Sequence, residues 1–425
     1  MKLLIKHGRV IDPANQRDEK SDILIDGNRI AQIAKRLTIA GAKTIEASGK
    51  IVLPGIIDMH VHLREPGRED QETIASATAA ALKGGITTVL AMPNTEPSID
   101  SPELVARLQA LIAQSARANV YIAGAITIGR KGEKLVDIAG MKKQGALALT
   151  DDGASVDNPS ILSAAFKKAK EQKLLVMCHC EDKKLSGAGC VNLGFISTRM
   201  GLRGISKESE YLRVKRDIEL AQSAGAPIHI THVSCQESVE VIARAKKQGL
   251  RVSADTAPHY FALTEEAVLR FDTNMKMNPP LRTKADVAAI KQGLRDGTID
   301  AIASDHAPHK ENEKDIEFDF ASFGVIGLET ELAVCISELI ETKVLDWTTL
   351  VQKLATNPAR ILGLEKGTLG VGGDADLIVL APERAWTVEQ GGFLSKSKNS
   401  PFLGRKLKGV VEYTLHKGKI AYQAK

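Results

Sequence analysis

Short apolar runs alternate with amphipathic segments between about residues 55 and 362. Alternation of strand-like and helix-like patterns is typical of β-α units that repeat around a parallel sheet. Eight such apolar runs are present, which is the number of strands that closes a (β/α)8 barrel. The runs are residues 56–62, 87–92, 119–126, 145–150, 174–179, 228–233, 251–256 and 301–305. We therefore predict an α/β protein with a TIM-like barrel.

Two of the intervening helices are marked by the residues that begin them. Ser101-Pro102 precedes a segment in which apolar residues recur on one helical face, and Asn158-Pro159 precedes another. Serine and asparagine are favoured N-caps, and proline is tolerated in the first helical turn. We expect helices to start at both places.

The two chain ends have a different pattern, in which short β-rich runs are separated by turn residues such as Asp26-Gly27. At the N-terminus these runs are residues 3–12, 22–33 and 44–55, and at the C-terminus they are residues 369–382 and 409–423. We expect residues 1–54 and 363–425 to build one small composite β-sandwich domain beside a barrel of residues 55–362.

The composition indicates a globular protein, since 43% of the residues are hydrophobic and 26% are charged. The net charge of +5 comes from scattered residues, so nucleic-acid binding is not expected. The first residues do not resemble a signal peptide, and no apolar stretch is long enough to cross a membrane. These features predict a cytoplasmic protein without membrane contact.

The five cysteines form an odd set without a paired framework, as expected where thiols stay reduced. Cys178 and Cys180 flank His179 in a strand-like run, and alternation should point both thiols away from that histidine. We therefore expect them to pack in the core rather than bind metal.

The positions of the histidines point to chemistry. Seven of the 10 histidines fall at or just after the end of a predicted strand, namely His60, His62, His179, His232, His259, His306 and His309. In a parallel barrel the carboxyl ends of the strands form the catalytic face. Asp152 and Asp305 add carboxylates at the same level.

This distribution predicts a metal centre. His60 and His62 alternate along one strand, so both imidazoles should face the mouth of the barrel. Six ligands exceed what one tetrahedral site needs, which indicates two ions. We assign His60, His62 and Asp305 to one ion, His179 and His232 to the other, and Asp152 as the bridge. Nitrogen and oxygen ligands suit Zn²⁺, and Mn²⁺ or Co²⁺ would also be accommodated.

A carbamylated lysine is not expected as the bridge. Lys142 and Lys143 precede the fourth predicted strand at 145–150, and no lysine stands at its end.

Several motifs carry a resemblance to a known family. They are PGIIDMHVHLREPG at 54–67, MPNTEP at 92–97, TDDG at 150–153, HCED at 179–182, KMNPPLR at 276–282, SDHAPH at 304–309 and FGVIGLET at 323–330. The chain closely resembles, over essentially its whole length, the dihydroorotase family (class I type) of the amidohydrolase superfamily. The H-x-H alone belongs to the superfamily at large, whereas the full set is far more specific.

The resemblance implies the reversible cyclisation of N-carbamoyl-L-aspartate to L-dihydroorotate in pyrimidine (UMP) biosynthesis. It implies that the six residues above bind metal and that Asp305 is catalytic, as the group that takes and delivers a proton. It also implies a homodimer and is compatible with a complex with aspartate transcarbamoylase. The substrate contacts that it implies are His62, Arg64, Asn94, Asn278, His309, Phe323 and Gly324.

The chemistry of these residues agrees with the resemblance. The guanidinium of Arg64 can hold a substrate carboxylate with two parallel hydrogen bonds, although a surface ion pair is the alternative. Asn278 lies in a proline-fixed segment that can aim its amide at a ring, and an ordinary Asx turn is its alternative.

Two other functions stay open from the sequence. One is a related hydrolase of the hydantoinase or allantoinase type, although those enzymes usually carry the bridging lysine that is missing here. The other is a silent dihydroorotase-like subunit that only scaffolds aspartate transcarbamoylase, although such subunits lose ligands that this chain retains.

Overall fold

The computed structural model describes residues 2–424, and its central unit is a barrel of eight parallel strands. The strands follow one another around the barrel in sequence order, and the predicted barrel is confirmed. A bridge between Val61 and His306 closes the ring between its first and last strands. The barrel strands are β6 (Ile56–Val61), β7 (Ile86–Ala91), β8 (Asn119–Gly124), β9 (Ala146–Leu149), β10 (Leu175–Cys178), β13 (Ile228–Ile230), β14 (Val252–Thr256) and β15 (Ala301–Ile302).

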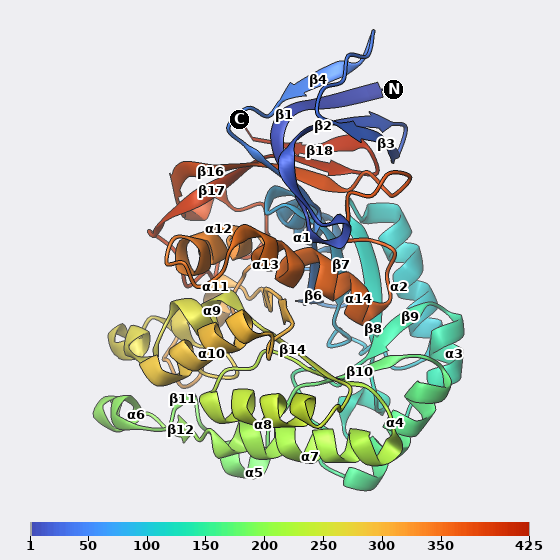
Figure 1. The fold of residues 1–425 in the computed structure, drawn as a ribbon. Coiled ribbons are helices and arrows are strands. Elements are labelled where there is room, and N and C mark those ends of the chain that lie inside the picture. The colour runs from blue at the N-terminus through green and yellow to red at the C-terminus, as the bar shows by residue number, and fades with distance from the viewer. Residues whose placement is uncertain (1, 425) are drawn as a thin grey trace.

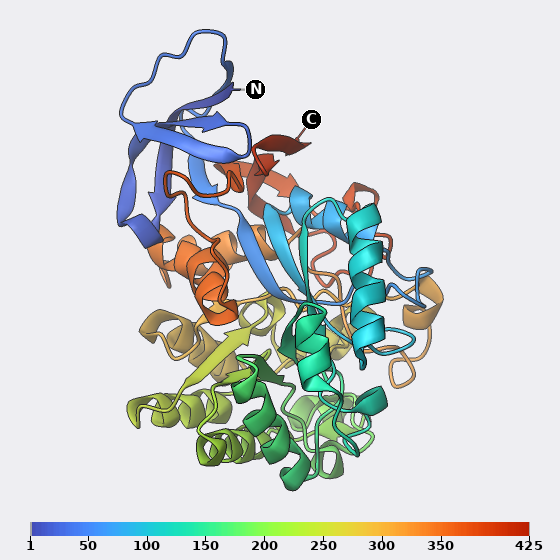
Figure 2. The same cartoon turned by 90° about the vertical axis from the view of Figure 1, so that its right-hand side faces the viewer.

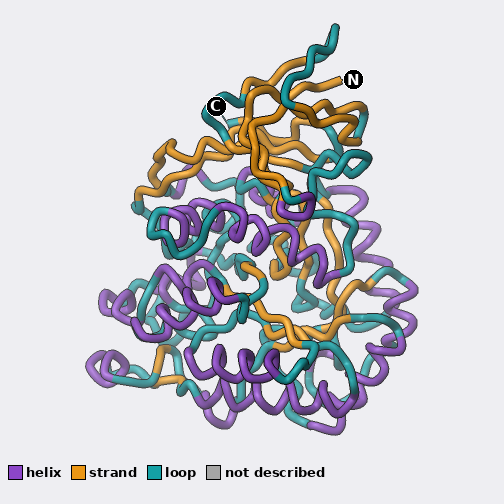
Figure 3. The backbone as a smooth tube through the Cα atoms, in the orientation of Figure 1, coloured by secondary structure: helices purple, strands orange, loops and turns teal. Residues whose placement is uncertain are grey.

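Helices surround the strands, as Figure 3 shows. The longer ones are α1 (Ile74–Lys83), α2 (Pro102–Ser115), α4 (Pro159–Glu171), α7 (Glu208–Ala224), α8 (Gln236–Lys247) and α10 (Lys284–Asp296). Short helices are α3 (Ile138–Lys143), α5 (Lys183–Ser186), α6 (Phe195–Met200), α9 (Pro258–Ala262), α11 (Glu311–Lys314), α12 (Glu331–Cys335), α13 (Trp347–Val351) and α14 (Asn357–Leu362). α12 and α13 each continue as a π-helical turn, at Ile336–Ile340 and Gln352–Thr356.

The two helix starts predicted from the sequence are both present. The Ser101 side chain accepts a hydrogen bond from the Leu104 amide at the start of α2, and the Asn158 side chain accepts one from the Ser160 amide at the start of α4. These bonds satisfy amide groups that have no partner within the helix.

Both chain ends contribute to one further sheet of eight strands, in the order β18-β17-β16-β5-β1-β2-β3, with β4 beside β1. It stands at one end of the molecule, where blue N-terminal and red C-terminal strands meet (Figures 1 and 2). The predicted composite sheet is therefore confirmed. Its strands are β1 (Lys2–Asp12), β2 (Arg17–Asp26), β3 (Arg29–Ala34), β4 (Lys43–Glu46), β5 (Ile51–Pro54), β16 (Leu377–Thr387), β17 (Lys406–His416) and β18 (Lys419–Gln423).

The sheet encloses an apolar core of its own. One buried cluster joins Ile30 of β3, Ile5 of β1 and Leu415 of β17, and Ile420 of β18 packs against it. Strands from opposite edges of the sheet therefore meet across this core, which gives the unit a sandwich-like form.

Two segments between the regular elements lie at the barrel mouth. Residues 187–205 carry α6 and a pair of short parallel strands, β11 (Val191–Asn192) and β12 (Gly204–Ile205). Residues 388–405, between β16 and β17, leave the composite sheet and contact barrel loops. No helix within residues 2–424 has the length and apolarity needed to span a bilayer.

Candidate active site

The six predicted metal ligands converge at the carboxyl ends of five barrel strands. His60 and His62 come from β6 and the residue after it, Asp152 follows β9, and the remaining ligands follow β10, β13 and β15. All six are buried. Val61, between the two histidines of β6, packs in the outer apolar layer as the alternation predicts. The pairing of β6 with β7 is irregular between Asp58 and Val61, where the histidines turn into the barrel mouth.

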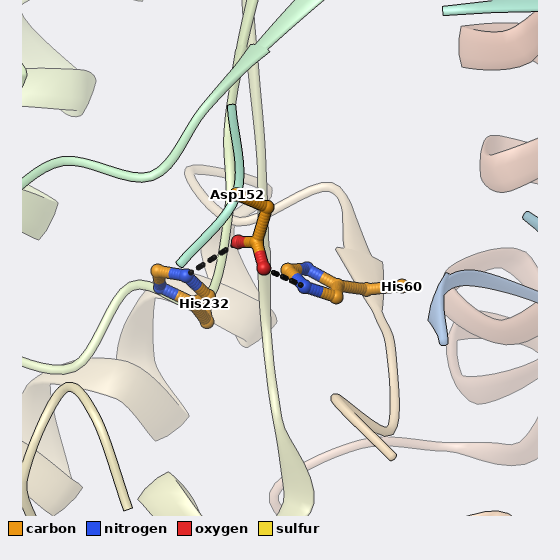
Figure 4. Close-up of side chains that lie close together, drawn as sticks. All are labelled: His60, Asp152 and His232. Carbon is orange, nitrogen blue, oxygen red and sulfur yellow. Dashed lines mark ion pairs between the residues drawn. The ribbon is translucent and has the colours of Figure 1, made fainter. Parts of the chain in front are cut away.

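Asp152 lies between the two groups of histidines. Its Oδ2 is 3.3 Å from His60 Nε2 and 3.5 Å from His62 Nε2. Its Oδ1 is 3.5 Å from His232 Nε2 and 3.6 Å from His179 Nδ1. Figure 4 shows the carboxylate between His60 and His232, with one oxygen turned toward each ring. One carboxylate oxygen therefore faces each predicted metal position.

The first position has four donor atoms at a suitable spacing. Asp305 Oδ1 lies 3.2 Å from His62 Nε2 and 3.5 Å from His60 Nε2, and Asp152 Oδ2 completes the set. Four ligands at 2.0–2.2 Å from a tetrahedral ion would stand roughly 3.3 to 3.6 Å apart. The donor separations match the edges of such a tetrahedron.

The second position has three protein donors. His179 Nδ1 and His232 Nε2 are 2.8 Å apart, and Asp152 Oδ1 lies within 3.6 Å of both. Three protein ligands with a fourth position left open are typical of a catalytic metal site.

Several polar atoms in this cluster have no hydrogen-bond partner within the described chain. They include both ring nitrogens of His60 and the Oδ1 of Asp152. Buried polar atoms are normally satisfied, and a cation would satisfy both of these ligand groups. The donor set and its unpartnered atoms therefore fit a metal centre.

The charges in the cluster support each other. Burial lowers the pKa of His60, but the carboxylates of Asp152 and Asp305 outweigh burial and raise this pKa to about 10. Burial alone would raise the pKa of Asp152, but the neighbouring imidazoles hold it well below its usual range. The same charges hold the pKa of Asp305 below its usual range, so both carboxylates are ionised at neutral pH. A cation bound beside them would take the place of the proton that they favour on His60.

The predicted substrate residues line the same cavity as five of the ligands. The cavity has a volume of ≈ 320 Å³, within the range of small-molecule sites. Its wall includes Arg64, Asn94, Asn278, His309, Phe323 and Gly324. The structure therefore brings every sequence-predicted residue to one place.

Arg64 is held against the loop that follows β15. Its Nε donates to the Pro308 carbonyl oxygen (3.1 Å), and its Nη2 lies 3.3 Å from His309 Nε2. Burial, with repulsion from Arg68, lowers the pKa of Arg64 to about 10, so it stays charged at neutral pH. Arg64 is half-buried and forms no ion pair with any residue from 2 to 424, so the surface ion pair considered as its alternative is not present.

Asn94 contacts a predicted metal ligand, and Asn278 contacts Glu181, which lies beside another one. Asn94 Oδ1 accepts a hydrogen bond from His62 Nδ1 (2.7 Å), which leaves His62 Nε2 to face the ligand cluster. Asn278 Nδ2 donates to Glu181 Oε2 (3.1 Å). Gly324 lines the cavity, but its amide donates to the Lys276 carbonyl. That amide is therefore already engaged within the chain.

Sequence reasoning missed Glu181. Its Oε2 lies 3.2 Å from His179 Nε2, on the ring edge opposite the Nδ1 that faces Asp152. A carboxylate in this position fixes the ring and its tautomer. Glu181 stands two residues after His179, and strand alternation was the signal that could have found it.

Two of the seven rim histidines, His259 and His306, lie neither in the ligand cluster nor in the wall of the cavity. His259 is buried, and burial lowers its pKa to about 4. His306 Nδ1 accepts a hydrogen bond from the Gly327 amide (3.2 Å) and its carbonyl accepts one from the His62 amide. Cys178 and Cys180 are buried in the apolar layer, as expected.

Three functional side chains sit on unusual backbone. Arg64, His232 and Asp305 have φ of 62°, 40° and 48°. Non-glycine residues rarely adopt positive φ, and such positions cluster at active sites.

Comparisons with known proteins agree with this site. A profile of the dihydro-orotase-like family matches residues 49–238, and one of the amidohydrolase family matches residues 332–422. A dihydroorotase of Elusimicrobium minutum is 50% identical over 99% of this chain and 97% of its own length. A dihydroorotase of Pelotomaculum thermopropionicum is 48% identical over 100% of this chain and 99% of its own.

Solved structures share the fold at lower identity. An L-hydantoinase (dihydropyrimidinase) of Arthrobacter aurescens superposes with a TM-score of 0.89 at 25% identity, over 98% of this chain and 95% of that one. A dihydropyrimidinase of Brevibacillus agri superposes with a TM-score of 0.85 at 24% identity, over 99% of this chain and 95% of that one. The much higher identity to full-length relatives decides between these groups, and the chain belongs to the dihydroorotase family.

Proposed function

We propose that this chain interconverts N-carbamoyl-L-aspartate and L-dihydroorotate as a metal-dependent cyclic-amide hydrolase. One observation carries the proposal: five of the six residues of the ligand cluster line a single cavity together with the half-buried, charged Arg64. The substrate is a small anion with a carboxylate beside a cyclic amide, and such a cavity offers a contact for each part. The full-length relatives named dihydroorotase support this reading over the hydantoinase alternative.

We further propose two Zn²⁺ ions per chain. His60, His62 and Asp305 would hold one ion, His179 and His232 the other, and Asp152 both. Divalent ions in such a site polarise a carbonyl oxygen and lower the pKa of a water molecule. The positions of Asp152 Oδ1 and Oδ2, each facing a different pair of histidines, support the bridge.

The residues of the chain have separate tasks in this proposal. Arg64 holds the substrate carboxylate, since a guanidinium matches a carboxylate with two parallel bonds. Asn94 and Asn278 orient the ring through their side-chain amides, and His309 adds a hydrogen bond. Asp305 acts as the general base that removes a proton from the attacking water and returns it to the ring nitrogen.

The remaining predictions concern the cellular compartment of the protein and its protein partners. Five free, buried cysteines suit a reducing compartment, which supports a cytoplasmic location. A homodimer and an association with aspartate transcarbamoylase stay predictions, and size measurements with and without that partner test them.

A substrate panel tests the activity. Purified protein should open L-dihydroorotate, followed by its ultraviolet absorbance, and should be far slower on hydantoin, dihydrouracil and allantoin. Elemental analysis should find two zinc ions per chain. Faster turnover of hydantoin than of dihydroorotate would contradict the substrate assignment, and a metal-free, inactive protein would favour a scaffolding subunit.

A further inference from the structure

A buried asparagine outside the barrel contacts two of the loops that carry predicted substrate residues, the loop of His309 and the loop of Gly324. Asn399 lies in the segment between β16 and β17, about 90 residues after the loop that follows β15. Asn399 is 5% exposed, and no sequence pattern singled it out. We infer that Asn399 is a positioning residue, which sets the substrate-carboxylate pocket without touching the metal ligands. The inference rests on the proposed function.

The hydrogen bonds of the Asn399 side chain define its orientation. Nδ2 donates to the carbonyl oxygens of Ala307 and Gly324, each at 3.1 Å. Oδ1 accepts from the His309 amide at 3.1 Å. Reversing the amide would place its NH₂ group against the His309 N–H, so only this orientation satisfies all three partners.

Two of these partners lie on either side of Pro308, the residue whose carbonyl oxygen holds Arg64. The bonds to Ala307 and His309 flank Pro308, whose carbonyl oxygen accepts from Arg64 Nε. The Asn399 amide therefore holds the Pro308–His309 peptide group, whose carbonyl oxygen accepts from the guanidinium, and the Ala307–Pro308 peptide group before it. Its third bond holds Gly324 beside the His309 ring, whose Nε2 donates to the Phe323 carbonyl at 2.8 Å.

The metal end of the same loop is held by other bonds. The His306 carbonyl accepts from the His62 amide at 2.9 Å, and the Ser304 amide donates to Asp58 Oδ1 at 3.2 Å. The loop after β15 is thus tied to the barrel near Asp305 and to Asn399 beyond it. Loss of the Asn399 bonds should loosen the substrate end and leave the metal end in place.

The segment around Asn399 is itself anchored to the loop after β6, which carries Arg64. Ser395 Oγ donates to Glu72 Oε2 (2.5 Å), and Ser397 Oγ donates to the Gln71 carbonyl oxygen (2.7 Å). The Asn399 carbonyl accepts from the Ile326 amide at 3.0 Å. Because three loops of the pocket are tied to this one segment, its asparagine can fix their relative positions.

Two variants separate the removal of the bonds from the loss of volume. Asn399→Asp keeps the shape and the acceptor for His309 but places a carboxylate oxygen against two carbonyls. Asn399→Ala removes all three bonds. Asn119→Ala is the matched control, because Asn119 also makes three side-chain hydrogen bonds, to Thr87, Thr88 and Asp376, at the start of β8.

Steady-state kinetics on L-dihydroorotate and zinc content are measured for each variant. We expect both Asn399 variants to raise KM about tenfold or more, with kcat changed less than about threefold and zinc unchanged. The increases of Asn399→Ala and Arg64→Ala should not add, since both act on one pocket. Asn119→Ala should leave KM unaltered even if it lowers the thermal midpoint equally.

Several outcomes overturn the inference. One is that the wild-type protein opens dihydroorotate and both Asn399 variants have the same KM as the wild type. Another is a loss of zinc and kcat at constant KM, which would place Asn399 among the supports of the metal centre. A wild type without dihydroorotase activity refutes the proposed function instead, so the two failures are distinguishable.

Discussion

At the scale of single residues, Asp305 meets two demands with one carboxylate. It is a donor of the first metal position, with Oδ1 3.2 Å from His62 Nε2, and it lies in the wall of the substrate cavity. Asp305→Asn keeps the shape but removes the basic oxygen that accepts the proton. We expect kcat to fall on the order of a hundredfold to ten-thousandfold. Stopped-time assays and zinc analysis check this, and near-normal turnover would remove Asp305 from its role.

Glu181 should act through the metal affinity. Its carboxylate faces His179 Nε2 and also accepts from Asn278. Glu181→Gln removes the charge that makes His179 a stronger donor, so zinc should bind about ten to a hundredfold more weakly. Competition with a chromogenic chelator measures this. Asp182→Asn is the control, because that neighbouring carboxylate pairs with Arg213 and contacts no predicted ligand. Equal affinities in both variants would contradict the prediction.

His309 predicts a pH dependence of stability. Burial, followed by repulsion from Arg64 and Lys314, lowers its pKa from 6.5 to about 3. Between these values the unfolded chain binds a proton that the folded chain does not, so the free energy of unfolding falls as the pH falls. The contribution is up to about 1.4 kcal/mol per pH unit in this window.

The measurement compares the change in thermal midpoint between two pH values in the wild type with the same change in His309→Asn. Between about pH 7.5 and about pH 5.5 the thermal midpoint of the wild type should drop further than that of His309→Asn. Other acid-sensitive groups are common to both proteins and cancel. Parallel drops would mean that folding leaves the pKa of the His309 imidazole unshifted.

The predicted metal ligands could be found from the sequence more readily than the residues that hold the site in place. His60, His179 and Asp305 follow strand-like runs, and the parallel arrangement alone brings strand ends together. Asn399 and Glu181 gain their roles from contacts between distant loops, which no local pattern encodes. The positive φ of Asp305 was also beyond prediction, since an aspartate carries no local signal for it beyond a weak preference.

At the scale of elements, all eight predicted barrel strands are present, but several are shorter than their apolar runs. β15 covers only Ala301–Ile302 of the predicted 301–305, and β13 covers Ile228–Ile230 of 228–233. In both cases the missing residues contain a ligand at positive φ, Asp305 or His232. The chain leaves the strand geometry there to turn the ligand toward the cavity, so function shortens these strands.

The loop at Gly324 gives a prediction at the scale of structural elements. Its φ is +121°, and a Cβ there would lie 2.6 Å from Ala307 Cβ and 3.3 Å from His309 Nε2. Gly324→Ala should therefore push the two substrate loops apart and raise KM about tenfold. Gly297→Ala is the control, since Gly297 has φ +84° with no atom near its absent side chain. The control should lose stability at unchanged KM, and equal KM values in both would contradict the steric argument.

At the scale of the whole molecule, the pairing of the two chain ends was predictable only in outline. The short β-rich runs indicated a shared sheet, but the join is between β5 and β16, far apart in sequence. Register across such a join depends on packing against the core that both ends enclose. The segment of residues 388–405 within this unit returns to the barrel mouth, which composition and periodicity did not indicate.

Metal removal should affect the stability of the entire barrel. The six predicted ligands come from the ends of five strands, so the proposed cation pair would link β6, β9, β10, β13 and β15 across the mouth. Ligands that bind only the folded state stabilise it, and without cations the buried side chains of His60, Asp152 and His232 keep polar atoms that have no hydrogen-bond partner within residues 2–424. Chelation should therefore lower the thermal midpoint by several degrees.

Zn²⁺ should restore the midpoint and Mg²⁺ should not, because imidazole ligands suit zinc. Asp152→Asn, which lacks the bridging charge, should shift much less on chelation. If scanning calorimetry finds the same midpoint in metal-free and zinc-loaded wild type, the cluster does not link the strands as the donor spacing indicates.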